Sequence, residues 1–374
     1  MKLNKKGFGV AEIAIVVLLI GILAAAVIAG FMGIKKNAND VADEQGKIAQ
    51  TMSNDLKHSF PIVLSDDQNG LIIKPGEYEV YDLNGNNLKD FKNSGIKTSD
   101  NINVDNIYTI VNEGGDLFIK GSGGTIEFSK YAIRHPSGTN GTTTIENTIL
   151  KINNSTVAGN YAMYIFGGTL NLHNVTFKSV QRGVAALYGA KINISADKDE
   201  YELTNNQSST GGYVIYAAAE GTEVTIDGGL YRSIPKNMIL CTEQATINVK
   251  NGTFKCKQNG NDNGADTRGM FMITTNGVIN ISGGLFDYSD AKKPENKFIV
   301  TFSGEGGTLN ISGGEFVTEM KYKSGTGTIV ITGGAFAVKP NAEWIPEGYS
   351  ISAEKQPVVC RDGVTRNLWV VTKN

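Results

Sequence analysis

One short pattern recurs between residues 149 and 336, and it constrains the fold more than any other feature of the chain. It places two aliphatic residues two positions apart, then glycine or asparagine, then an aromatic residue or valine. The copies are ILKINNSTV (149–157), LNLHNVTF (170–177), VTIDGGLY (224–231), INVKNGTF (247–254), INISGGLF (279–286), LNISGGEF (309–316) and IVITGGAF (329–336), with KINISADKDEY (191–201) as a longer form. Successive copies lie 20 to 32 residues apart, a spacing typical of a solenoid with loops.

Each copy is interpreted as a strand followed by a sharp corner. Side chains alternate along a strand, so Ile279 and Ile281 are predicted to point inward and Asn280 outward. The first corner residue of the copies is Asn154, Asn174, Gly228, Asn251, Gly283, Gly313 or Gly333. Glycine and asparagine adopt left-handed backbone angles at low cost, so a bend with positive φ is predicted at this stacked position.

The last residue of each copy is predicted to point inward as well. These residues are Val157, Phe177, Tyr231, Phe254, Phe286, Phe316 and Phe336. Equivalent positions of a solenoid stack, so an internal aromatic column is expected. With ~4.8 Å between strands and about 25 residues per coil, the repeat predicts ten or eleven coils in a rod of ~50 Å. The glycine content, 45 of 374 residues, then reflects corners and tight turns.

The repeat resembles the right-handed parallel β-helix of the pectate-lyase-like superfamily and the glycine-rich repeats of bacterial surface proteins. A two-sheet β-sandwich is the structural alternative, and it would show antiparallel hairpins with varied turns. The β-helix is assigned to residues 111–338 and an N-terminal cap or linker to residues 61–110. Residues 339–374 contain AEWIPEGYSI and LWVV and resemble the closing segment of such surface proteins, so they are predicted to be the C-terminal cap.

The N-terminal segment carries a membrane or export signal. Basic residues precede an apolar run from Phe8 to Ile34, whose only charge is Glu12. A run of this length can span a bilayer, and the basic residues favour a cytoplasmic N-terminus with the rest of the chain outside. A secretory signal peptide and a plain anchor are the alternatives. The run is longer than the apolar part of a signal peptide, and neither alternative explains a carboxylate within it.

The stretch KKGFGVAEIAIVVLLIGILAA resembles the type IV prepilin family, with Gly7 before the cleavage site and Phe8 after it. The resemblance implies that prepilin peptidase removes the leader, residues 1–7, and that the Phe8 amine is N-methylated. It also implies that Glu12, the fifth mature residue, supports assembly with other pilin-like subunits. A neighbouring Glu12 carboxylate can neutralise the new amino group inside an apolar bundle, where an unpaired charge is costly.

The pilin-type helix is predicted to fill residues 8–60, with 8–34 as its transmembrane part. Beyond the membrane part, Ile48, Met52 and Leu56 recur on one helical face. Pro61 ends the helix, because proline disfavours helical angles in the residue before it. The resemblance implies that the second half of the helix packs on the head domain. The predicted fold is therefore mainly β: a right-handed parallel β-helix preceded by a long N-terminal helix.

Catalytic and metal-binding signatures are not evident in the sequence. His58, His135 and His173 are scattered without the spacing of metal ligands, so no catalytic residue, metal or cofactor is predicted. Cys241 aligns with the inward Ile273 and is interpreted as a small core residue. A bridge between Cys241 and Cys256 remains open beside the favoured buried thiols, and Cys360 lies in the predicted cap.

The outward strand positions of successive copies carry amides and a hydroxyl in place of acids: Asn171, Asn193, Thr225, Asn248, Asn280 and Asn310. One interpretation is a solvated face with hydrogen bonds along the stack. The other interpretation is a flat polar surface that binds glycans, with the five asparagines as the candidate ligand face. The acids lie instead in loops that leave one corner of the coil: Asp262, Asp266, Asp287 and Asp290.

Two functions are compatible with these features. The first is a pilin-like subunit of a type IV pilus or pseudopilus, whose β-helix head serves adhesion or structural spacing at the cell surface. The second is a surface-tethered polysaccharide lyase or glycoside hydrolase on the same β-helix. The missing acid cluster favours the first. A formal net charge of −2 argues against a general nucleic-acid binder. The expected location is the cytoplasmic membrane with the head outside, and then the cell surface or pilus.

Overall fold

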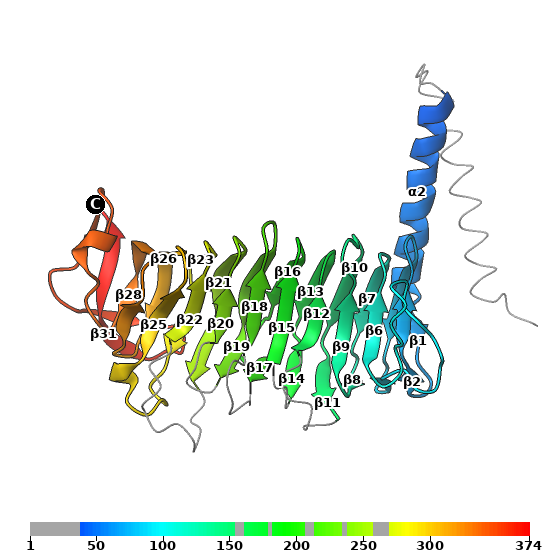
Figure 1. Ribbon diagram of the computed structural model, residues 1–374, viewed down its shortest axis with the longest axis horizontal. Helices are drawn as coiled ribbons and strands as arrows, with labels where there is room; N and C mark the ends of the chain where they lie inside the picture. The colour runs from blue at the N-terminus through cyan, green and yellow to red at the C-terminus, as the bar shows by residue number, and fades with distance from the viewer. Residues whose placement is uncertain (1–37, 154–160, 179–181, 206–212, 234–237, 257–268) are drawn as a thin grey trace, which may run out of the picture.

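The computed structural model describes residues 38–153, 161–178, 182–205, 213–233, 238–256 and 269–374. These residues wind into an elongated stack of parallel strands, with a helix at the N-terminal end and antiparallel strands at the C-terminal end (Figure 1). The architecture is the mainly β, parallel solenoid that the repeat predicts. Parallel pairing from coil to coil excludes the antiparallel sandwich.

Each coil contributes up to three strands, and each strand stacks on its equivalents in the neighbouring coils. The first strands are β1 (Ile62–Val63), β4 (Tyr78–Asp82), β7 (Asp116–Lys120), β10 (Thr142–Glu146), β13 (Thr169–His173), β16 (Lys191–Ser195), β19 (Glu223–Ser233), β21 (Thr246–Cys256), β23 (Val278–Ile281), β26 (Thr308–Phe316) and β28 (Thr328–Phe336). The second strands are β2 (Gln68–Asn69), β5 (Asn87–Lys89), β8 (Thr125–Phe128), β11 (Ile149–Ile152), β14 (Thr176–Lys178), β17 (Glu202–Asn205) and β24 (Leu285–Asp287). The strands β19, β21, β26 and β28 are longer and continue through the corner. Each of them supplies both the first and the second strand of its coil.

The third strands form a smaller sheet of their own. They are β3 (Leu71–Ile73), β6 (Tyr108–Asn112), β9 (Tyr131–His135), β12 (Tyr161–Ile165), β15 (Arg182–Leu187), β18 (Ile215–Ala218), β20 (Ile239–Cys241), β22 (Gly269–Thr274), β25 (Phe298–Ser303) and β27 (Lys321–Ser324). Within the described residues this sheet has ten strands, so the stack holds ten full coils, as predicted. A short 3-10 helix, η1 (Pro294–Asn296), precedes β25.

The predicted alternation of side chains is confirmed. Ile279 of β23 pairs with Leu309 of β26, and Ile281 pairs with Ile311, and all four side chains are buried in one continuous core. The aromatic column is also present in the later coils. The rings of Tyr231, Phe254, Phe286, Phe316 and Phe336 are stacked with centroids 4.5 to 5.0 Å apart.

The frame predicted for the first copy of the pattern is wrong. Strands β10 and β11 align with β13 and β14, and Leu150 is the partner of Phe177. Leu150 therefore takes the inward place assigned to Val157, which lies outside the described residues together with Asn154. The corner of this coil is Asn147, with φ of 52°. The true copy, TTIENTIL, has threonine and leucine where the others have aliphatic and aromatic residues, and this hides it.

In the later corners, the left-handed residue lies one position further along than predicted. Positive φ occurs at Asn174 and Gly228, as predicted. In the four later copies, φ is positive at the second corner residue and not at the first. The second corner residues are Gly252, Gly284, Gly314 and Gly334, and the first are Asn251, Gly283, Gly313 and Gly333. Glycine is needed at the first corner position for a different physical reason. A Cβ atom on Gly313 would lie 2.2 Å from the carbonyl oxygen of Ser282 in the preceding coil, so close stacking, and not φ, requires glycine there.

The parallel stack begins earlier than predicted. Strands β1, β2 and β3 pair with β4, β5 and β6, so residues 61–110, expected as a cap or linker, carry the first coils. Leu88 of β5 aligns with Ile126 and then with Leu150. Aliphatic residues thus fill the place of the rings in these coils, which is why the sequence pattern does not reveal them.

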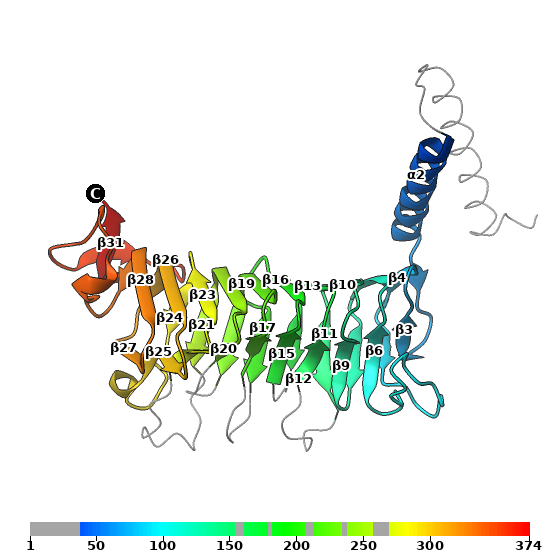
Figure 2. The same cartoon turned by 45° about the horizontal axis from the view of Figure 1, so that its top comes forward.

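The described helix, α2 (Ala38–Ser59), rises from the first coils and points away from the stack (Figures 1 and 2). It ends just before Pro61, as predicted, and residues 8–37 of the predicted helix lie outside the described residues. The last turn of the helix contacts the stack. Lys57 pairs with Glu79 at 3.2 Å, and the His58 ring packs edge-on against Phe118. Ile48 is 43% exposed, so the described helix does not lie along the head.

Residues 339–374 form the predicted C-terminal cap. Strand β31 (Thr365–Lys373) pairs antiparallel with β28, and β29 (Tyr349–Ile351) and β30 (Gln356–Val359) pair antiparallel with β31. These contacts end the parallel stack over the larger sheet. The cap is also tied back across several coils, because Arg361 bonds Asp199 at 2.8 Å and Asn251 at 2.7 Å.

Candidate functional site

The outward asparagines form one ladder along the larger sheet. In coil order the ladder is Asn171, Asn193, Thr225, Asn248, Asn280 and Asn310. The Nδ2 of Asn193 donates to Oδ1 of Asn171 at 2.9 Å. In the later coils the Nδ2 of Asn280 donates to Asn248 at 2.8 Å, and that of Asn310 donates to Asn280 at 2.9 Å. The predicted hydrogen bonding along the stack is confirmed.

This ladder has a structural role that its chemistry explains. An amide carries two N–H donors and a carbonyl acceptor, so each asparagine can bond to the coil before it and still present a donor outward. Asn171 continues the ladder to Thr144 at 3.1 Å, and Asn248 donates to Glu223 at 2.8 Å. The glycan-binding surface predicted on these side chains stays a prediction.

The residues predicted for export and assembly, Gly7, Phe8 and Glu12, lie outside the described residues. In the part of the chain that is described, no helix is long and apolar enough to cross a membrane.

The three cysteines are buried thiols. Cys241 of β20 pairs with Ile273 of β22, as predicted for a small core residue. Burial raises the pKa of Cys241 to about 12, so this thiol stays protonated and unreactive at neutral pH. Cys256 lies in the same core, and Cys360 lies in a small cluster beneath the cap.

A buried polar network was missed by the sequence analysis, and it crosses the core near the first coils. Asn112 Nδ2 donates to Thr143 Oγ1 at 3.0 Å, and Thr143 Oγ1 lies 2.9 Å from His135 Nε2. His135 Nδ1 lies 3.2 Å from the carbonyl oxygen of Gly167, so Nδ1 carries the proton and Nε2 accepts from Thr143. The alternation Ile133, His135 places this histidine inward, and that was the available signal.

Burial lowers the pKa of His135 to about 4, below the ordinary value of about 6.5 that the unfolded chain would show. As pH falls, the imidazole of His135 is protonated in the unfolded chain at a higher pH than in the folded chain. The free energy of unfolding therefore decreases as pH falls from about 6.5 to about 4. A shift of this size corresponds to about 3 kcal/mol. We expect denaturant titrations at several pH values to show this loss, and His135→Gln to flatten it. Equal pH slopes for the two proteins would contradict the assignment.

Among the residues that have described positions, the other histidines and acids do not gather into a reactive group. His173 lies on the outer face and contacts Ser195 and Asp197. Asp287 accepts from Thr318 at 3.1 Å, while Asp262 and Asp266 lie outside the described residues. Among the residues that the structure describes, no three or more His, Cys, Asp or Glu side chains are grouped so as to hold a metal ion.

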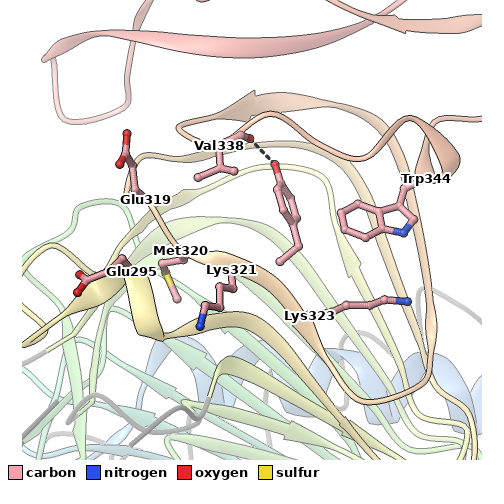
Figure 3. Close-up of a pocket in the computed structure, with 8 residues that line it drawn as sticks. Glu295, Glu319, Met320, Lys321, Lys323, Val338 and Trp344 are labelled. Atoms are coloured by element: carbon pink, nitrogen blue, oxygen red, sulfur yellow. Dashed lines mark hydrogen bonds between the residues drawn. The ribbon is translucent and has the colours of Figure 1, made fainter. Parts of the chain in front are cut away.

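A pocket of about 480 Å³ opens where the smaller sheet meets the cap, and no sequence pattern predicted it. Its lining consists of Glu295, Glu319, Met320, Lys321, Tyr322, Lys323, Val338 and Trp344. Figure 3 shows Trp344 and the two glutamates on opposite sides, with Lys321 and Lys323 between them. Trp344 belongs to a 3-10 helix of the cap, η2 (Ala342–Trp344), and the lysines belong to β27.

The comparisons with known proteins found no relatives. No protein-family description, no curated protein and no solved structure matches the chain.

Proposed function

We propose that the chain is a pilin-like subunit, held in the cytoplasmic membrane and assembled with similar subunits through residues 8–60. Its head is a right-handed parallel β-helix that serves adhesion or structural spacing at the cell surface or pilus. The observation that carries the proposal is the polarity of the stack. The helix enters at one end of the stack, roughly at right angles to its long axis, and the cap closes the other end, so the whole head is carried on a single helical stalk at its N-terminal end (Figure 1).

Export follows from the resemblance of the N-terminal residues to type IV prepilins. Prepilin peptidase would cut between Gly7 and Phe8 and methylate the new amine. Glu12 of one subunit would then pair with the cationic Phe8 amine of the next, since both charges are costly to leave alone in an apolar bundle. A helix from Phe8 to Ser59 would be ~78 Å long, enough to span the membrane and carry the head clear of it.

The full chain should be expressed in a host with prepilin peptidase and in a matched strain that lacks it. With the peptidase, N-terminal mass spectrometry is expected to find a chain that begins at N-methylated Phe8. Without it, the chain should begin at Met1 and remain in the membrane fraction. A mature N-terminus near Val27, or an intact Met1 in both strains, would refute the proposed processing.

A further inference from the structure

The two sheets of the solenoid end differently at the cap. The larger sheet continues from β28 into the antiparallel strand β31. The smaller sheet stops at β27, which pairs with β25 on one side and, within the described residues, has no strand on its other side. After β28 the chain forms η2 where another coil would add a strand, so Trp344 arrives beside the open edge of β27.

The base of the resulting pocket is aromatic and held in place. The rings of Tyr322 and Trp344 have centroids 5.0 Å apart and are tilted by 56°. The Tyr322 hydroxyl donates to the carbonyl oxygen of Val338 at 2.6 Å, which locks the ring against the cap. The two rings are partly buried, and Met320 adds apolar surface to the lining.

The rim of the pocket carries two cations and two anions. The ammonium groups of Lys321 and Lys323 donate hydrogen bonds, whereas the carboxylates of Glu295 and Glu319 accept them. The formal charges of these four lining groups cancel, and Lys355, which is not part of the lining, pairs with Glu319 at 4.0 Å. Each lysine also sits over an aromatic ring, with Lys323 Nζ 5.9 Å from the centre of Trp344 and Lys321 Nζ 5.6 Å from that of Phe298.

A peptide strand added to β27 is the alternative occupant, and the lysines argue against it. Lys321 and Lys323 both lie on β27, the strand with which an added peptide would have to pair. Charged side chains on an edge strand, lysines above all, oppose the addition of a further strand. The edge is therefore open in shape but unsuited to β-augmentation.

We propose that this pocket binds a neutral saccharide. Trp344 stacks on the apolar face of one sugar ring, and the rim groups bond its hydroxyls. A hydroxyl both donates and accepts, which matches a rim of donors and acceptors without net charge. An anionic ligand would meet the two glutamates, and a cationic one the two lysines. The volume lies within the range of small-molecule sites. This inference rests on the adhesive form of the proposed function and names its ligand class.

The test uses the full chain in a zwitterionic detergent without a sugar headgroup. The chain has two tryptophans, so Trp369→Phe leaves Trp344 as the sole indole fluorophore. Neutral tetrasaccharides of glucose, N-acetylglucosamine, xylose and mannose are titrated beside tetragalacturonate and an extended octapeptide. We expect at least one neutral tetrasaccharide to change the fluorescence saturably.

Calorimetric titration of this tetrasaccharide into the wild-type chain then tests the residues. Trp344→Ala should weaken binding by about tenfold or more, and Trp344→Phe by less. Glu319 is 75% exposed, and Glu319→Gln removes only its 4.0 Å surface ion pair with Lys355, so this variant is expected to fold. Glu319→Gln should weaken binding by about threefold, which keeps the test valid if Trp344→Ala misfolds.

Several results would overturn the inference: binding of the octapeptide or of tetragalacturonate alone, no binding by any neutral tetrasaccharide, or binding that neither Trp344→Ala nor Glu319→Gln changes. Cleavage at Phe8 is read separately by mass spectrometry. Failure of the saccharide site with correct processing would therefore leave the pilin-like assignment in place.

Discussion

Replacing Phe286 with alanine is expected to destabilise the head by about 4 kcal/mol, because a buried ring is lost and a cavity remains. Phe286 is 1% exposed and stacks between Phe254 at 4.9 Å and Phe316 at 4.5 Å. Phe271 also meets the ring edge-on. The loss should show as a lower denaturant midpoint and as faster hydrogen exchange in β21, β24 and β26, since each coil of a solenoid contacts its neighbours only.

Phe286→Leu is the matched control. Leucine keeps most of the apolar volume, and Leu203 already fills the column position between Phe177 and Tyr231. We expect it to cost about 1.5 kcal/mol. If both substitutions lowered the free energy of unfolding equally, the column would contribute through contacts specific to aromatic rings and not through filled volume. If neither lowered it, a packed core at Phe286 would be contradicted.

Gly313→Ala is expected to cost about 3 kcal/mol, the upper range for overpacking a close-packed site. Its φ is not left-handed, so alanine adds no backbone strain of that kind. The new methyl would instead lie 2.2 Å from the Ser282 carbonyl oxygen and 2.9 Å from its carbon. Neither atom can move without separating two coils. Thermal unfolding and hydrogen exchange of β23 and β26 measure the effect.

Gly348→Ala separates the two reasons for glycine. Gly348 has φ of 85°, but an added Cβ would meet nothing within 4 Å. Alanine there should cost about 1 kcal/mol, the cost of a left-handed non-glycine residue alone. If Gly313→Ala were the milder change of the two, close coil stacking would not be the reason for glycine at the first corner position.

The sequence predicted the solenoid, its later coils, the aromatic column, the asparagine ladder and the cap. These features depend on alternation along a strand and on corners that repeat at the same place in each coil. Asn280 and Phe286, for example, belong to one short copy of the pattern, and their directions follow from its spacing. Stacking then places each residue against its equivalent in the next coil.

Other features could not be obtained in this way. The coils between Ile62 and Lys120 fill the column position with aliphatic residues such as Leu88, so no pattern marks them. Which of the two corner glycines has positive φ, and which one is required by close stacking, depends on how near the preceding coil passes, a property of the tertiary structure. The role of His135 depends on Thr143 and Gly167, which bond its two ring nitrogens in the folded chain.

The sequence by itself determined which residues of the later coils face the core and which face water, because that property depends on near neighbours along the chain. The tertiary structure alone decided where the stack begins. It also decided that the cap covers the larger sheet and leaves β27 open. The pocket between Glu295 and Trp344 follows from that choice, since its residues come from separate turns that meet only when the last coil is closed.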